Sequence, residues 1–312
     1  MLVAAPPPPP PGLIVFDQIS LDGQRTFIFR ERGDGSERVV VLHNGWDPVW
    51  SPDGRFIAAF QGPGITVMTR DGRVVRRVRT VGSTAYLTWS PDGSWFAYVA
   101  EHCQDPAGHE DPSCGTLWVV HIVGSGQRRA SREQAVALVY SFERPYTWSP
   151  DGRRIAFAGL EGLVVSDVLT GRRHLLGPTA GIEAVPDWSP DGRRLLYTYG
   201  DGLVTSAPDG SSRQIVRDAR DTLLAAWSPD GSRIAYVRRV HGDDWRVFVS
   251  APNGDARVQL GQTQSDRPLV WSPDGRFLLV GIAGDDRFEI FRADGRGRPR
   301  FIRGGEDGDW GP

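Results

Sequence analysis

A pentapeptide, Trp-Ser-Pro-Asp-Gly, recurs through this chain at nearly regular spacing. Its six copies begin at Trp50, Trp89, Trp148, Trp188, Trp227 and Trp271. The steps between successive copies are therefore 39, 59, 40, 39 and 44 residues. A period near 40 residues, filled with short strand-like segments, indicates a repeat architecture and is typical of a β-propeller.

The chemistry of the pentapeptide predicts a tight turn between two strands. Proline presets φ for the second position of a turn, and glycine accepts the positive φ that later positions need. The serine and aspartate can bond nearby backbone N–H groups. A short strand follows each copy, for example 153–158 and 193–197. We expect each tryptophan to fill the wedge between adjacent repeats, so the motif is interpreted as scaffold and not as a functional site.

The two ends of the chain complement each other. Segments 13–18, 25–30 and 38–42 match the second, third and fourth strands of a repeat, but no first strand precedes them. Residues 309–312, Asp-Trp-Gly-Pro, are a degenerate copy of the motif that ends a first strand. An unpaired sheet edge is an aggregation hazard. We therefore predict an all-β propeller with seven four-stranded blades, closed by pairing of the N- and C-terminal segments.

Composition sets the domain organisation and excludes some partners. Residues 1–12 include six consecutive prolines, which form neither helix nor strand, and are interpreted as a Pro-rich linker or a trimmed signal remnant. Residues 13–312 are expected to form a single domain. The net charge is −2 and no apolar run is long enough to span a bilayer. These features argue against a nucleic-acid partner and against membrane insertion, and we expect a monomer.

The repeated pentapeptide, followed each time by a strand such as Arg-Ile-Ala-Phe or Arg-Leu-Leu-Tyr, resembles the WD40-like repeat of the TolB-like β-propeller family. A similar repeat occurs in the propellers of prolyl oligopeptidase-type peptidases. The resemblance covers nearly the whole chain. It implies a bacterial, periplasmic, secreted or envelope-associated protein that binds a protein partner, and TolB itself implies six blades as the alternative count.

One insertion carries the two cysteines of the chain. Cys103 and Cys114 lie in the loop 101–115, together with His102 and His109. A disulfide between them would limit the unfolded chain and would imply an oxidising compartment. The alternative is a zinc or copper site formed by His102, Cys103, His109 and Cys114, although the spacing matches no ordinary zinc finger. Free thiols remain a third alternative.

Known catalytic motifs are absent from the sequence. It contains no G-x-S-x-G, H-E-x-x-H, G-x-x-x-x-G-K or G-x-G-x-x-G opening a helix. We therefore predict a non-enzymatic scaffold without a cofactor. Two alternatives stay open: a metal-dependent lyase or hydrolase acting at the channel mouth, and the ectodomain or sensor domain of a longer membrane-anchored protein.

Loop lengths predict which side of the ring binds a partner. Turns after the first and third strands of each repeat should share one face, the motif face. Loops after the second and fourth strands should share the other, the variable-loop face, and these vary most in length. Aromatic and arginine side chains dominate interface hot spots. The candidates are Trp46, Tyr86, Arg144, Tyr146, Trp245 and Arg267. Acidic residues in the same loops favour calcium or a basic segment of a partner.

Overall fold

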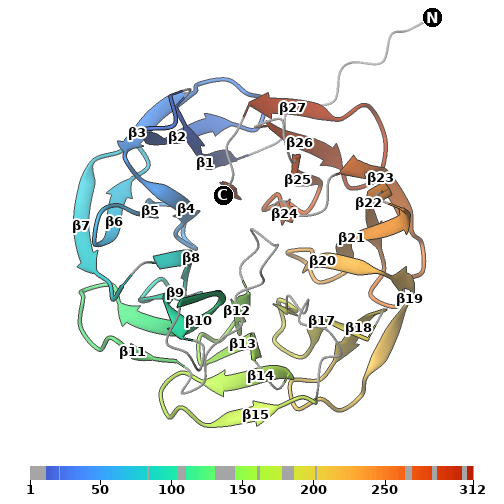
Figure 1. The fold of residues 1–312 in the computed structure, drawn as a ribbon. Helices are drawn as coiled ribbons and strands as arrows, with labels where there is room; N and C mark the ends of the chain where they lie inside the picture. The colour runs from blue at the N-terminus through green and yellow to red at the C-terminus, as the bar shows by residue number, and fades with distance from the viewer. Residues whose placement is uncertain are drawn as a thin grey trace, which may run out of the picture.

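The chain forms a closed ring of four-stranded sheets around a central channel (Figure 1). The structure is a computed structural model that describes residues 12–20, 22–82, 84–104, 110–130, 145–159, 162–177, 186–200, 202–242, 244–263, 269–282, 287–303 and 308–311. All regular elements in these ranges are β-strands. The described residues contain no helix long and apolar enough to cross a bilayer.

Seven antiparallel blades make up the ring, as the repeat count predicts. In order from the channel outward, blade 1 contains β28 (Gly308–Trp310), β1 (Leu13–Ile19), β2 (Thr26–Arg32) and β3 (Val39–His43). Blade 2 contains β4 (Trp46–Trp50), β5 (Phe56–Phe60), β6 (Gly64–Thr69) and β7 (Val74–Arg79). Blade 3 contains β8 (Thr84–Trp89), β9 (Trp95–Gln104), β10 (Glu110–His121) and β11 (Arg128–Arg129). Blade 4 contains β12 (Tyr146–Trp148), β13 (Arg154–Gly159), β14 (Gly162–Asp167) and β15 (Arg173–Leu175). Blade 5 contains β16 (Asp187–Trp188), β17 (Leu195–Tyr199), β18 (Gly202–Ser206) and β19 (Gln214–Arg220). Blade 6 contains β20 (Thr222–Trp227), β21 (Ile234–His241), β22 (Asp244–Ser250) and β23 (Val258–Thr263). Blade 7 contains β24 (Leu269–Trp271), β25 (Phe277–Ile282), β26 (Arg287–Arg292) and β27 (Arg300–Arg303).

Blade 1 combines the two ends of the chain, and this confirms the predicted closure. β28 pairs antiparallel with β1, so that Trp310 lies opposite Ile14 and Gly308 opposite Phe16. The N–H of Gly311 also donates to the carbonyl of Leu13 at 2.8 Å. The six-bladed alternative is therefore wrong for this chain, because the C-terminal segment supplies the first strand of a seventh sheet.

Apolar residues of neighbouring sheets form the core between the blades. Each second strand is almost fully buried, as in β5, where Ile57, Ala58, Ala59 and Phe60 have no exposed surface. Strands buried on both faces need continuous apolar sequence, which the segments after the motif provide. The motif tryptophans retain at most 8% of their surface, with Trp89 packed against Val49, Ala58 and Phe96. They occupy the wedges between blades, as expected.

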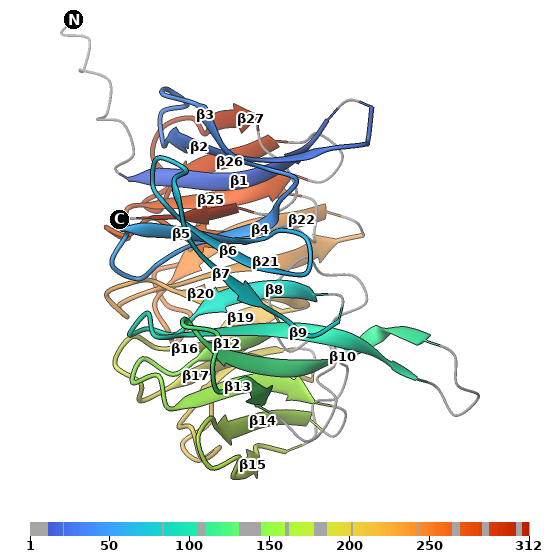
Figure 2. The same cartoon turned by 90° about the vertical axis from the view of Figure 1, so that its left-hand side faces the viewer.

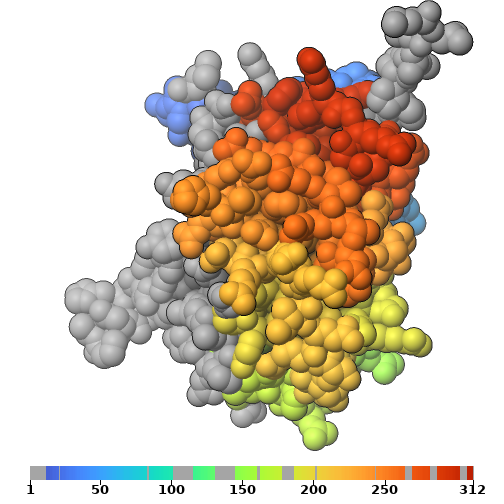
Figure 3. Space-filling view, turned by 90° about the vertical axis from the view of Figure 1, so that its right-hand side faces the viewer, coloured from blue at the N-terminus to red at the C-terminus, as the bar shows by residue number. Residues whose placement is uncertain are grey.

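The outer strands of the blades form the wall of the ring, and one hairpin projects beyond it. Figure 3 shows the residues of blades 5, 6 and 7, coloured from yellow to red, following one another along this wall. β9 and β10 are the longest strands described, with 10 and 12 residues. They extend well beyond the other blades on the variable-loop face (Figure 2).

Candidate functional site

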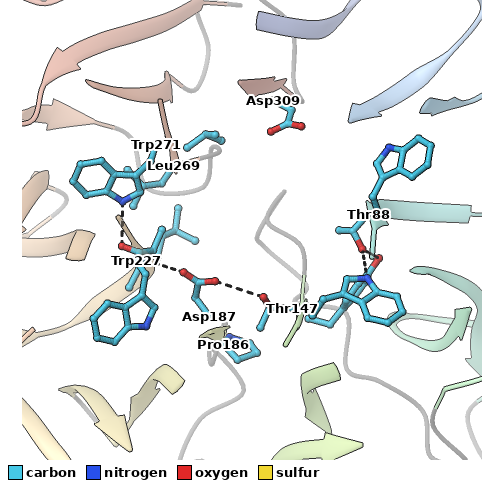
Figure 4. A pocket seen from close by; sticks show the side chains of 15 residues that line it. Thr88, Thr147, Pro186, Asp187, Trp227, Leu269, Trp271 and Asp309 are labelled. Atoms are coloured by element: carbon cyan, nitrogen blue, oxygen red, sulfur yellow. Dashed lines mark hydrogen bonds between the residues drawn. The ribbon is translucent and has the colours of Figure 1, made fainter. Parts of the chain in front are cut away.

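The central channel contains a cavity of about 370 Å³ (Figure 4). Its walls come from the first strands of blades 1 and 3 to 7 and from the residue before β16. The lining residues are Thr88, Trp89, Tyr146, Thr147, Trp148, Pro186, Asp187, Leu224, Ala225, Ala226, Trp227, Leu269, Val270, Trp271 and Asp309. Asp187 and Asp309 carry the charge among these lining residues, so the cavity is acidic within an otherwise aromatic, aliphatic and hydroxyl-bearing wall.

The residue before each tryptophan faces the channel, because side chains alternate along a strand. Thr88, Thr147, Asp187 and Asp309 occupy this position in blades 3, 4, 5 and 1, and all four are partly exposed. The adjoining tryptophan points instead into the blade interface. In blades 3 and 4 its indole N–H reaches back to the preceding blade: Trp89 Nε1 donates to the carbonyl of Val49 at 3.4 Å, and Trp148 Nε1 donates to Thr88 Oγ1 at 3.1 Å.

The two channel carboxylates connect successive blades. Asp309 accepts a hydrogen bond from the backbone N–H of Trp50 at 2.8 Å, and Asp187 accepts one from the N–H of Trp227 at 2.7 Å. The hydroxyl of Thr147 lies 3.5 Å from the second oxygen of Asp187 (Figure 4). Each carboxylate therefore satisfies a backbone donor of the next blade while it faces the channel.

Asp187 differs from an ordinary surface aspartate in its protonation. Burial raises the pKa of this carboxyl from 3.8 to about 7, although hydrogen bonds from the N–H groups of Trp227 and Trp188 and from Thr147 act in the opposite direction. Desolvation disfavours the charged form when no cation lies nearby to compensate. A cationic group in the cavity would supply that compensation and would restore the charged carboxylate.

The mouth of the channel on the variable-loop face has irregular backbone. β4, β8 and β20 each contain a register shift near their start, at 46–49, 85–88 and 222–224 respectively. Asp47, Tyr86 and Asp221 near these shifts have φ of 52°, 62° and 50°. Non-glycine residues adopt such angles at an energetic cost, and bulges of this kind re-aim side chains near functional sites.

A second set of carboxylates stabilises this mouth. Asp17 and Asp47 are only 7% and 5% exposed. Asp17 accepts a hydrogen bond from the N–H of Asp47 at 3.2 Å, and Asp47 accepts one from the N–H of Leu87. The two residues thus join blades 1, 2 and 3 through backbone donors that the bulges leave without a strand partner.

Three predicted binding residues lie together at this mouth. Trp46, Tyr86 and Tyr146 belong to the first strands of blades 2, 3 and 4. The indole N–H of Trp46 donates to the carbonyl of Thr84 at 3.3 Å, and the hydroxyl of Tyr146 donates to the carbonyl of Tyr86. Tyr146 is only 2% exposed. It therefore holds the strand of Tyr86 in place, whereas Trp46 and Tyr86 keep partly exposed surface.

The other predicted binding residues do not join this row in the described structure. Trp245 lies in β22, the third strand of blade 6, where the guanidinium of Arg239 stacks 5.6 Å from its ring. It packs partly against the core between blades 6 and 7. Arg144 and Arg267 lie outside the described residues.

The cysteine insertion is described only in its backbone. Cys103 belongs to β9 and Cys114 to β10, and the ladder places Cys103 opposite Asp111, with register shifts between Asp111 and Gly115 and between Gly115 and Thr116. The side chains of His102, Cys103 and Cys114, and the whole of His109, lie outside the described part of the structure. The disulfide and the zinc or copper alternative both stay predictions. Elsewhere in the described residues, no group of three His, Cys, Asp or Glu side chains is placed to hold a metal.

Sequence reasoning missed the channel carboxylates as site residues. The sequence pattern does not single out Asp187, and it indicates Asp309 as part of the closing strand and as one of the acidic residues of the variable-loop face. A signal was present, because the position before the motif tryptophan is polar in some copies and apolar in others, as at Val49, Ala226 and Val270. Such variation inside an otherwise constant motif marks the side chains that face the channel.

Comparison with known proteins gives a fold and no family assignment. No family model matches the chain. No curated protein matches it either. The similar solved structures include TolB from Acinetobacter baumannii, with a TM-score of 0.60 and 15% identity over 96% of this chain and 82% of that one.

Two enzyme-named propellers are equally similar. A candidate 6-phosphogluconolactonase from Bacteroides uniformis has a TM-score of 0.61 and 13% identity, covering 95% of this chain and 97% of that one. An oligogalacturonate lyase in complex with manganese has a TM-score of 0.62 and 11% identity, covering 92% and 87%. Since one fold hosts unrelated activities, these likenesses show that the chain shares the β-propeller fold of TolB proteins and of propeller enzymes.

Proposed function

We propose that this protein is a non-enzymatic binding scaffold that takes a protein or peptide partner on the variable-loop face, with a basic side chain of the partner entering the channel. The observation that carries this proposal is the acidic cavity, in which Asp187 and Asp309 face the channel among threonine, tyrosine and tryptophan side chains. A guanidinium or ammonium group would pair with these carboxylates through charge-assisted hydrogen bonds.

The shape of the mouth supports a macromolecular partner. The long β9–β10 hairpin projects beside it, and Trp46 and Tyr86 retain exposed surface there. Anchoring aromatic residues around a concave centre are typical of interface hot spots. An extracytoplasmic location is part of the proposal and rests on the TolB likeness and on the predicted disulfide between Cys103 and Cys114.

A second candidate function is catalysis in the same channel. The pKa of about 7 at Asp187 is suited to a general base near neutral pH, and similar structures include a lyase and a candidate lactonase. In that case the substrate would be a small molecule in the cavity and the partner surface would be secondary.

Selection from a displayed library of random dodecapeptides tests the first proposal. Enriched peptides are expected to contain arginine or lysine. Asp187→Asn and Asp309→Asn should each weaken their binding about tenfold in fluorescence anisotropy, because a charge-assisted hydrogen bond is lost while the backbone acceptor is kept. Asp209→Asn, in an exposed turn on the motif face, is the matched control.

Two outcomes would contradict this proposal. Enriched peptides without basic residues, or equal binding by Asp187→Asn and Asp309→Asn, would show that the channel carboxylates do not recognise the partner. Turnover of a lactone or an unsaturating cleavage of a uronate polymer, abolished by Asp187→Asn, would establish the catalytic candidate.

A further inference from the structure

A second surface, on the outer rim of blade 2, is unlike the rest of the ring. β7 is the last strand in the sheet order β4-β5-β6-β7, so one of its edges has no strand beside it. It lies at the perimeter of the ring in Figure 1 and faces the viewer in Figure 2. An exposed strand edge offers backbone N–H and C=O groups to another extended segment.

The charge on this edge is of one sign. Arg73, Arg76, Arg77 and Arg79 are all exposed, and none forms an ion pair with another described residue. The stretch 72–91 contains no aspartate or glutamate. β7 therefore presents three arginines, Arg76, Arg77 and Arg79, with Arg73 in the turn before it, and no acidic residue follows them before Asp92.

Several other exposed arginines of the described structure have carboxylate partners. Arg217 lies 2.8 Å from Asp255 across blades 5 and 6, and Arg292 lies 2.6 Å from Asp294 in blade 7. In blade 1, Arg32 lies 2.7 Å from Glu37. Arginines in blades 1, 5 and 7 are therefore compensated locally by a carboxylate. The arginines of β7 have no such partner among the described residues, although they are exposed to solvent.

The two sides of β7 have different surroundings. Val78 is 2% exposed and packs into the core between blades 2 and 3. Arg77 and Arg79 flank it in sequence and therefore share the opposite side of the strand. Val74 and Val75, at the start of the strand, are 38% and 43% exposed next to a register shift. The edge thus combines arginines on one side with apolar surface at one end.

We propose that β7 binds an acidic, extended peptide segment, which adds to blade 2 as a fifth strand. Backbone pairing would give affinity, and carboxylates of the segment opposite Arg77 and Arg79 would give specificity. A second copy of this chain is a poor occupant, because antiparallel pairing of β7 with itself brings arginines against arginines. The β7 surface is separate from the channel, and this inference does not depend on the function proposed for the channel.

The test uses the whole protein and a labelled Val-Glu-Val-Glu-Val-Glu peptide with blocked ends. We expect saturable binding and slower hydrogen exchange of the backbone amides in 74–79. Two further peptides carry N-methyl groups on every valine or on every glutamate. Strand pairing requires free N–H groups along one edge of the peptide, so at least one of these peptides should fail to bind.

Charge reversal separates recognition from loss of fold. The double variant Arg77→Glu/Arg79→Glu should weaken peptide binding at least about tenfold and should gain binding of the Val-Lys-Val-Lys-Val-Lys peptide. The control Arg296→Glu/Arg298→Glu, with the same charge change in an exposed turn of blade 7, should bind as the wild type does.

Three results would overturn this inference. The first is no saturable binding by the wild-type protein. The second is equal binding of both N-methylated peptides, which would indicate charge attraction without strand pairing. The third is binding of heparin or duplex DNA, lost in Arg77→Glu/Arg79→Glu, when the acidic peptide does not bind. That result would assign the patch to a polyanion instead.

Discussion

The pKa of a carboxyl group depends on its surroundings, as an exposed and a buried example show. Asp53 in the first motif accepts a hydrogen bond from Ser51 at 2.6 Å, and this bond, the largest influence, helps hold its pKa below 3.8. Glu31 in β2 is 1% exposed, and one of its oxygens has no hydrogen-bond partner. Burial raises its pKa from 4.5 to about 7, although Arg38, 3.7 Å away, favours the charged form.

Glu31→Gln is expected to change the pH dependence of stability. Between pH 4.5 and 7 the folded protein holds a proton on Glu31 that the unfolded chain has released, so this residue makes stability fall as pH rises. The variant should lose that contribution and melt about 2–4 °C higher than wild type at pH 8, with little difference at pH 4.5. Differential scanning calorimetry across this range measures both.

Glu37→Gln, at an exposed glutamate paired with Arg32, is the control and should keep the wild-type slope. Asp187 has a pKa raised in the same direction, so Asp187→Asn should remove a further part of the slope. If Glu31→Gln and wild type melt in parallel from pH 4.5 to 8, Glu31 is charged in the folded protein and the assignment is wrong.

Among the elements, the short closing strand β28 carries a large share of one blade interface. Trp310 is 5% exposed and packs in one cluster with Ile14, Phe16 and Phe277. Asp309 reaches across to Trp50 of blade 2. Three residues thus cover the edge of β1 and complete the contact of blade 1 with both neighbours.

Deleting residues 307–312 should destabilise the fold strongly. The deletion exposes the edge of β1 and removes a buried tryptophan, whose loss alone costs about 3–5 kcal/mol. We expect a fall of many degrees in Tm and aggregation on heating, measured by calorimetry and light scattering. Trp310→Ala should produce part of this loss. An unchanged melting curve for the deletion would mean that β28 does not hold the ring together.

The β9–β10 hairpin leads to a prediction on its cysteines. We expect Cys103 and Cys114 to be bonded in protein purified from an oxidising compartment, with a contribution of about 2–3 kcal/mol. Intact-mass measurement after alkylation without reductant should show no added alkyl group. Uptake of two groups would reject the bond, and zinc or copper at one equivalent per chain would favour the metal alternative.

At the scale of the whole molecule, the ring is closed by a blade that both ends of the chain build. The termini of the ring lie side by side, because Gly311 is bonded to Leu13. Closure by strand pairing ties the first and last segments together with backbone hydrogen bonds as well as packing. Other blade contacts in the ring rest on side chains and on single bonds such as those of Asp187 and Asp47.

Circular permutation separates these two kinds of closure. With residues 12 and 311 joined by a short linker, new ends between β7 and β8 leave seven intact blades and no shared one, so Tm should fall. New ends in the turn between β4 and β5, at Asp53 and Gly54, recreate a shared blade and should melt close to the wild type. Equal melting of both permutants would show that side-chain packing closes the ring without the shared blade.

Much of the fold could be predicted from local chemistry. The motif specifies a turn through Pro and Gly, and in every copy the serine and aspartate close it, as Ser228 does with Asp230 at 2.6 Å. Repetition of that turn predicted the blade count. The closure was predicted because the N-terminal repeat lacks a first strand, while the C-terminal end carries an extra motif-like tryptophan, Trp310. The turn depends on residues close together in sequence, and the closure could be inferred by comparing the two ends of the chain with the repeat, so no knowledge of the ring was needed.

The candidate site depended on the ring itself. The channel brings Thr147, Asp187 and Asp309 around one cavity from strands many residues apart, and their distances follow from how seven twisted sheets pack. Bulges at Asp47 and Tyr86 set where side chains point at the mouth, and no local pattern announced them. The pKa of Asp187, and the lack of a carboxylate partner for the β7 arginines among the described residues, likewise follow from which charges the neighbouring blades supply. A repeated sequence determines how each blade folds, whereas side chains meet in the channel or pair on the rim only when the blades close.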